Sequence, residues 1–95
     1  MQISRPVQTA TELGAILKKA RIDADLRQRD AADLCGVSER FLIELEQGKP
    51  GARLELVLNV CRGLGVALEV RAPGPTESGM PKRRKARMRS LRAAT

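Results

Sequence analysis

The fold is decided by residues 28–47, which read Q-R-D-A-A-D-L-C-G-V-S-E-R-F-L-I-E-L-E-Q. The spacing predicts one short helix over 28–35, followed by Gly36, a residue that tolerates the left-handed backbone found at helix ends. Two residues later Ser38 is suited to cap a second helix, which has Glu39 in its first turn and ends near Glu46. The segment is therefore predicted to be two short helices joined by a tight turn.

The two predicted helices have an inner and an outer side. A small residue, Ala32, lies where the helices cross, and the second helix is held on the core by Val37, Leu42 and Leu45. Its outer side is left to Ser38, Glu39, Arg40, Ile43 and Glu44. A helix that projects its N-terminal part in this way fits the major groove of B-form DNA, which is about 12 Å wide. The alternative is a plain pair of core helices.

Another helix is predicted before this pair. Thr9 and Glu12 have the spacing of a capping box, so the helix begins there and ends near 23–25. Its apolar face consists of Leu13, Ile16, Leu17 and Ala20. Three cations are placed on the other side and in the last turns, where they suit the helix dipole: Lys18, Lys19 and Arg21.

A fourth helix is predicted after the pair. Apolar residues recur at helical spacing at Leu54, Val57, Leu58, Cys61 and Leu64. Gly51 is a tolerable N-cap, although weaker than Ser or Thr, and the glycines at 63 and 65 stop the helix. Four helices with an aliphatic core predict an all-α fold.

A short strand is predicted at residues 66–70, because Val66, Leu68 and Val70 alternate with less apolar residues. One strand alone leaves its backbone groups unpaired, so it needs a partner. We expect it to pair with the same strand of a second copy in a homodimer, and these three residues are the predicted dimerisation residues. The alternative partner within the chain is the segment 1–4.

The charge is unevenly distributed along the 95 residues, which carry a net charge of +7. Residues 80–95 hold seven basic side chains and no acid, so residues 1–79 balance, with 11 basic against 11 acidic side chains. We expect an N-terminal arm at 1–8, one domain at 9–71 and a flexible, disordered basic tail at 72–95. The tail either contacts an anionic partner, supplying part of a nonspecific attraction to DNA, or only aids solubility.

Composition argues against catalysis. The chain has no His, which removes the commonest general base and metal ligand, and its two cysteines supply only half a zinc site. We predict no enzyme activity, no catalytic residue, no metal and no cofactor; Cys35 and Cys61 lie on apolar helix faces, as small hydrophobic residues. No stretch approaches the ~20 apolar residues of a membrane span, and no secretory signal is evident, so a soluble cytoplasmic protein is expected.

Residues 28–47 resemble the helix-turn-helix of the phage-repressor family (lambda-repressor-like, XRE). Gln28 stands where that family has a DNA-contacting Gln, Ala32 at its small crossing residue and Gly36 at its turn glycine. The run L-I-E-L-E-Q-G at 42–48 resembles the end of the family's recognition helix. A wider match, over about 9–71, is similar to HipB-like antitoxins. One departure is Arg27, which replaces the usual Thr or Ser cap of the first helix of the pair.

The resemblance implies a compact four-helix lambda-repressor-like domain, with a C-terminal strand for dimer pairing. It also implies a dimeric transcriptional repressor that binds palindromic operator DNA and a HipA-type kinase toxin. Two alternatives stay open: a free-standing XRE-type repressor without a toxin, and a nucleic-acid-associated bridging factor that acts through the basic tail. The operator sequence and any effector are not indicated by the sequence.

The candidate DNA-binding residues fall into two groups. For phosphates we expect Arg27, Gln28, Arg29 and Lys49. For bases the leading candidate is Arg40, whose planar fork suits guanine O6 and N7, while Ser38 is versatile and Glu39 or Glu44 accepts from cytosine N4. Ile43 completes the outer side of the recognition helix.

Overall fold

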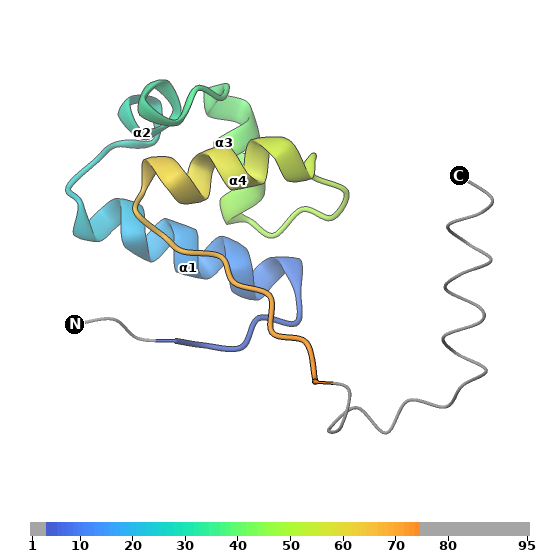
Figure 1. The fold of residues 1–95 in the computed structure, drawn as a ribbon. Helices are drawn as coiled ribbons and strands as arrows, with labels where there is room; N and C mark the ends of the chain where they lie inside the picture. The colour runs from blue at the N-terminus through green and yellow to red at the C-terminus, as the bar shows by residue number, and fades with distance from the viewer. Residues whose placement is uncertain (1–3, 75–95) are drawn as a thin grey trace.

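A computed structural model describes residues 4–74 and contains four α-helices. They are α1 (Ala10–Asp23), α2 (Gln28–Cys35), α3 (Glu39–Glu46) and α4 (Leu54–Gly63). Helix α3 packs against α1 and α2, and α2 also packs against α4. Figure 1 shows α1 along the lower side of the domain and α2 at its upper side, with the segment after α4 running down across α1 in that view. The predicted all-α, four-helix fold is confirmed.

Local cues fix the first helix, as predicted. The hydroxyl of Thr9 accepts a hydrogen bond from the backbone N–H of Glu12 at 3.1 Å. The Glu12 carboxylate in turn accepts from the backbone N–H of Gln8 at 3.2 Å and from the Thr9 hydroxyl at 3.0 Å. The first of these bonds gives a partner to an N–H group that a helix start leaves without one, and the other two hold the Glu12 side chain back against the cap. The predicted capping spacing therefore marks the true start of α1.

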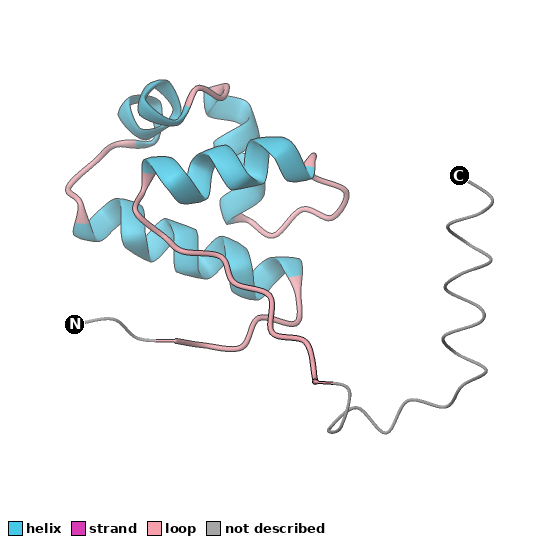
Figure 2. Cartoon of the chain, in the orientation of Figure 1, coloured by secondary structure: helices cyan, strands magenta, loops and turns pink. Residues whose placement is uncertain are grey.

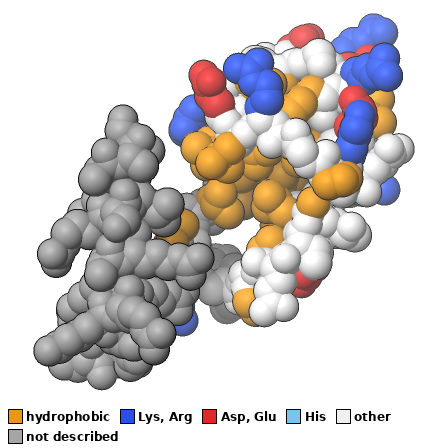
Figure 3. All heavy atoms as spheres, turned by 90° about the vertical axis from the view of Figure 1, so that its right-hand side faces the viewer, with side chains coloured by type: hydrophobic (Ala, Val, Ile, Leu, Met, Phe, Trp, Pro, Cys, Tyr) orange, Lys and Arg blue, Asp and Glu red, His pale blue; other side chains and the backbone are white. Residues whose placement is uncertain are grey.

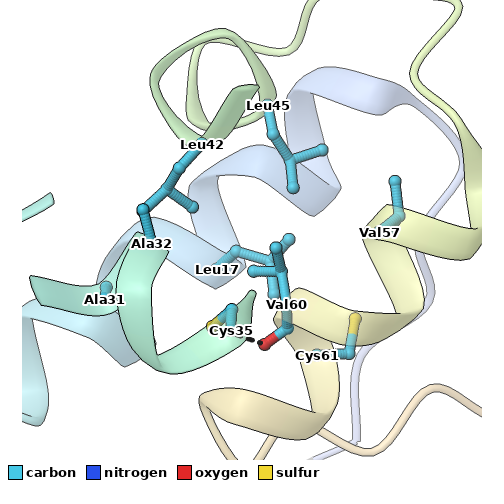
Figure 4. Packing of buried hydrophobic residues seen from close by; sticks show 9 residues of the cluster. All are labelled: Leu17, Ala31, Ala32, Cys35, Leu42, Leu45, Val57, Val60 and Cys61. Atoms are coloured by element: carbon cyan, nitrogen blue, oxygen red, sulfur yellow. Dashed lines mark hydrogen bonds between the residues drawn. The ribbon is translucent and has the colours of Figure 1, made fainter. Parts of the chain in front are cut away.

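The core is aliphatic and draws on all four helices (Figure 4). Leu17 from α1, Leu42 from α3 and Val60 from α4 are its largest fully buried side chains. The two cysteines are unpaired and buried, and burial raises the pKa of both thiols above the ordinary value. The Cys35 thiol donates to the carbonyl oxygen of Val60 at 3.7 Å. Both cysteines thus pack as small hydrophobic residues, as predicted.

The predicted fourth helix is correct in existence but not in detail. Its N-cap is Arg53, without a side-chain cap, rather than Gly51. Leu54 is 65% exposed, while Val60, absent from the predicted apolar face, is fully buried. In α2, Leu34 is also 61% exposed, although it is large and apolar. Without a capping side chain, the start and the orientation of α4 are set by packing against the rest of the domain.

The strand predicted at 66–70 is not formed within this chain. Figure 2 shows these residues as loop, and residues 4–74 contain no strand. The physical reason is that a strand requires a second strand for its backbone hydrogen bonds, and no described segment of the chain supplies one. The alternative partner, residues 1–4, falls almost wholly outside the described residues, as does most of the predicted basic tail.

Candidate nucleic-acid interface

A tight turn sets α3 against α2. Gly36 has the left-handed φ of +71° that ends α2, and the next N–H, that of Val37, donates to the carbonyl of Ala32 at 3.0 Å. The hydroxyl of Ser38 then accepts from the N–H of Phe41 at 3.0 Å and caps α3. Because Leu42 and Leu45 are buried, α3 cannot rotate about its axis without exposing them. The turn and the core together therefore fix which side of α3 faces outward.

The outer side of α3 carries the residues predicted from the spacing. Ser38, Glu39 and Arg40 are exposed, and Ile43 and Glu44 are half-buried. The Arg40 side chain is 89% exposed at the N-terminal end of the helix. The structure thus places together a hydroxyl, a guanidinium and two carboxylates, which are groups that form hydrogen bonds with base edges in a major groove.

The residues predicted to meet phosphates lie around this helix. Arg27, Arg29 and Lys49 are exposed, and Gln28 is half-buried. Arg27 occupies the N-cap of α2 but caps no N–H; instead its Nε lies 3.2 Å from Oδ2 of Asp30. The first N–H groups of α2 therefore have no side-chain partner, which favours an anion at this helix start.

Gln28 is held from inside the domain by a residue that the sequence analysis did not single out. Its Nε2 donates to Oε1 of Glu46 at 3.2 Å. The same carboxylate accepts two bonds from Arg21, from Nε at 2.7 Å and from Nη2 at 3.0 Å. Arg21 also donates through Nη1 to the carbonyl of Leu26 at 2.9 Å. The Glu46 side chain is only 3% exposed, so one buried carboxylate ties α1, α2 and α3 together.

This network corrects the place given to Arg21 among the outer cations of α1: its side chain is only 11% exposed. The sequence held a signal for the pair. Leu42, Leu45 and Glu46 follow the i, i+3, i+4 spacing of an inward face, and an acid on such a face requires a cationic partner. Which cation it meets is a tertiary fact that the spacing does not give.

Glu44 binds two cations of the candidate interface. Its Oε1 lies 3.6 Å from Nε of Arg40, one turn earlier, and its Oε2 accepts a hydrogen bond from Nζ of Lys49. The hydrogen bond from Lys49 and the positive charges of both cations lower the pKa of Glu44, against a smaller opposing effect of burial. At neutral pH this side chain is an ionised acceptor.

A small hollow of about 190 Å³ lies beside this ion pair, between α3 and the loop that follows it. It is lined by Phe41, Glu44, Leu45, Lys49, Pro50, Gly51, Ala52 and Arg53. Within residues 4–74 no group of His, Cys, Asp or Glu side chains is arranged to hold a metal ion. Over the same residues, none of the helices is both long and apolar enough to cross a membrane.

Comparison with known proteins identifies the family. The helix-turn-helix domain family matches this chain over residues 12–73. An uncharacterised HTH-type transcriptional regulator of Sinorhizobium fredii, y4mF, is 36% identical over 72 residues, which cover 76% of this chain and 95% of the relative. These matches span both helices of the turn and the candidate interface.

Solved structures agree with this assignment. HipB in the HipA-HipB-O2-O3 complex superposes with a TM-score of 0.67 at 14% identity, covering 75% of this chain and all of that one. The clp gene regulator ClgR from Corynebacterium glutamicum has a TM-score of 0.58 at 33% identity, over 70% of this chain and 85% of its own. The chain therefore belongs to the helix-turn-helix family of DNA-binding transcriptional regulators and has a HipB-like, XRE-type fold.

Proposed function

We propose that this protein is a transcriptional repressor that reads palindromic operator DNA as a homodimer and serves as the antitoxin of a HipA-type kinase toxin. The observation that carries the DNA part is the outer side of α3, where Arg40 stands exposed at the N-terminal end of a helix fixed by the turn at Gly36. Such a helix places its first residues against base edges when it enters a major groove.

Phosphate contacts complete the proposed binding mode. The N–H groups at the start of α2 lack a side-chain cap, and Arg27, Arg29 and Lys49 are exposed around α3. Gln28 donates one N–H of its Nε2 to Glu46, which leaves the second N–H of Nε2 for a phosphate oxygen. Phosphate contacts of this kind position the protein, and base contacts select the sequence.

The DNA-binding proposal is tested by replacing Arg40 and Gln28 with Ala. The probe is a duplex that the purified protein selects from a randomised library, and affinity is measured by fluorescence anisotropy. Loss of a bidentate arginine–guanine contact is expected to weaken binding by about 1–3 kcal/mol, which is about 5- to 150-fold. The double replacement should remove the preference for the selected duplex over an arbitrary one.

The matched control is Lys19→Ala, which removes one cation from an exposed position of α1. It should change affinity far less than Arg40→Ala. If Arg40→Ala and Gln28→Ala leave binding unaltered while deletion of residues 80–95 abolishes it, the rival reading, a bridging factor acting through the basic tail, is correct.

The dimer proposal concerns residues 66–70. Leu68 and Val70 keep 42% and 94% of their surface exposed, although both are large and apolar. Figure 3 shows hydrophobic side chains gathered on one face of the described part of the molecule, below a charged region. Pairing of this segment with that of a second copy would satisfy its backbone groups and cover Leu68 and Val70. Such a dimer spaces two recognition helices about one DNA turn apart, ~34 Å.

A charge placed on the pairing face should dissociate the dimer. Leu68→Asp is expected to raise the dimer dissociation constant about tenfold or more, since burial of an unpaired carboxylate costs several kcal/mol. Ala67→Asp adds the same charge on the other face of the extended segment and should have little effect. Light scattering at micromolar concentration measures both. A monomeric wild-type protein would rule out the dimer.

The antitoxin part rests on fold likeness to HipB, which is seen in complex with HipA. It is separated from the alternative, a free-standing XRE-type repressor, by purifying the tagged full chain from its native cells. Mass spectrometry that identifies a bound HipA-type kinase supports the antitoxin. Operator DNA recovered without any such kinase supports the free-standing repressor.

A further inference from the structure

The cations of the candidate interface differ in how they are engaged in the free protein. Arg40 and Lys49 both contact the Glu44 carboxylate, one through Nε at 3.6 Å and the other through a hydrogen bond from Nζ. Arg29 makes no ion pair with any residue in the range 4–74. Arg27 is paired separately with Asp30. Arg40 and Lys49 are therefore distinguished by sharing one anion of the protein itself.

The two acids on the outer side of α3 also differ. Glu39 is exposed and forms no ion pair within the described part of the chain. Glu44 is only 29% exposed and contacts both cations, Arg40 within α3 and Lys49 across the turn that follows it. The hydrogen bond from Lys49, together with the charges of Lys49 and Arg40, lowers the pKa of Glu44 from its ordinary value, so the side chain is an anion at neutral pH. Only Glu44 is placed to act on Arg40 and Lys49 directly.

A carboxylate that binds an arginine and a lysine uses the same charge-assisted hydrogen bonds that a DNA phosphate offers. DNA that binds Arg40 or Lys49 competes with Glu44 for that cation and favours its separation from the carboxylate. On any DNA sequence this separation has a cost. Only on the correct sequence does Arg40 gain two directed bonds to O6 and N7 in return.

We propose that Glu44 competes with DNA for Arg40 and Lys49 and so lowers the affinity for DNA, which keeps binding to incorrect sequences weak. This inference rests on the proposed DNA-binding function. The cost of releasing the two cations is the same on every sequence, so the competition lowers the affinity for correct and incorrect DNA alike. Only on correct DNA do the guanine bonds of Arg40 offset that cost. In this role Glu44 does not itself contact a base, which distinguishes it from a reader of cytosine N4.

The salt dependence of binding follows from the same competition. Each phosphate neutralised by the protein contributes about −0.9 to the slope of log K against log salt concentration. Cations that stay on Glu44 in a nonspecific complex contribute nothing. Removing the Glu44 charge frees them for phosphates, so the slope on nonspecific DNA should become steeper by about 0.9 for each new contact.

The test compares Glu44→Gln with Glu39→Gln in the full chain. Both variants remove one negative charge from the same side of α3, so the change in net charge is equal. The probes are a duplex selected by the wild-type protein and an arbitrary duplex of equal length. We expect Glu44→Gln to tighten binding to the arbitrary duplex about fivefold and to steepen its salt slope by about one phosphate contact. Glu39→Gln frees no cation from an ion pair, so it measures the general effect of removing one negative charge from this side of α3, and it should steepen that slope less than Glu44→Gln does.

Three outcomes decide the inference. Equal effects of the two variants on affinity and slope would refute competition by Glu44. A loss of preference at a single base pair in Glu44→Gln, without tighter nonspecific binding, would show that Glu44 reads a base instead. In both cases a large loss in Arg40→Ala would leave the proposed DNA-binding function intact, whereas no loss in Arg40→Ala would refute that function itself. Thermal unfolding of each variant checks that the fold is retained.

Discussion

Glu46→Ala is expected to destabilise the domain by about 3–5 kcal/mol, the cost of breaking a buried ion pair by removal of one partner. The Glu46 side chain is 3% exposed and that of Arg21 is 11% exposed, so the replacement leaves a guanidinium without its anion in a nearly dry place. It also removes the acceptor of the Gln28 amide. Urea unfolding followed by circular dichroism measures the change in the free energy of unfolding, provided that the slope of this free energy against urea concentration is the same in both proteins.

Two further variants distinguish the breaking of a buried ion pair from the loss of an exposed charged side chain. Asp23→Ala breaks the pair of Lys19 and Asp23, whose side chains are 66% and 62% exposed, and is expected to cost less than about 1 kcal/mol. Replacing Arg21 and Glu46 together by Met removes the buried charges as a pair and should recover much of the stability. A decrease of less than about 1 kcal/mol in the free energy of unfolding of Glu46→Ala would show that water screens the pair of Arg21 and Glu46.

The helix bounds were predictable because their signals are local. Gly36 follows the last residue of α2 with the expected positive φ, and Ser38 caps α3 through its hydroxyl. Thr9 does the same for α1. Each of these residues acts within three or four positions of its partner, so one sequence suffices to recognise it. The prediction for α4 was weaker because Arg53, its N-cap, makes no side-chain cap.

The outer side of α3 was also predictable, since it follows from helical period and the burial of Leu42 and Leu45. The pairing among its charged residues was not. Lys49 reaches Glu44 because the chain folds back after α3, where the N–H of Lys49 donates to the carbonyl of Glu44 at 3.0 Å. Arg21 and Glu46 meet across 25 residues of sequence, through the packing of α1 on α3.

The need for glycine at position 14 is another feature that comes from tertiary packing and cannot be predicted from the sequence pattern. A Cβ placed on it would lie 2.4 Å from the carbonyl oxygen of Leu45 and 2.9 Å from that of Glu46. Both contacts are backbone atoms, so no side chain can rotate to relieve them. Gly14 thus allows α1 to approach the C-terminal end of α3 closely, beside the pair of Arg21 and Glu46.

Gly14→Ala is expected to destabilise the domain by about 2 kcal/mol, measured by urea unfolding. Overpacking costs up to about 3 kcal/mol, and alanine returns about 1 kcal/mol as the better helix former. The control is Ala15→Gly at the next, exposed position of α1, which should cost about 1 kcal/mol from helix propensity alone. The sign of the change in unfolding free energy decides between the two effects, because Gly14→Ala would stabilise the protein if helix propensity dominated at residue 14. Destabilisation would mean that the added methyl group forces α1 away from α3. Because α1 packs on α3, this change would also weaken the packing that fixes the orientation of the outer side of α3.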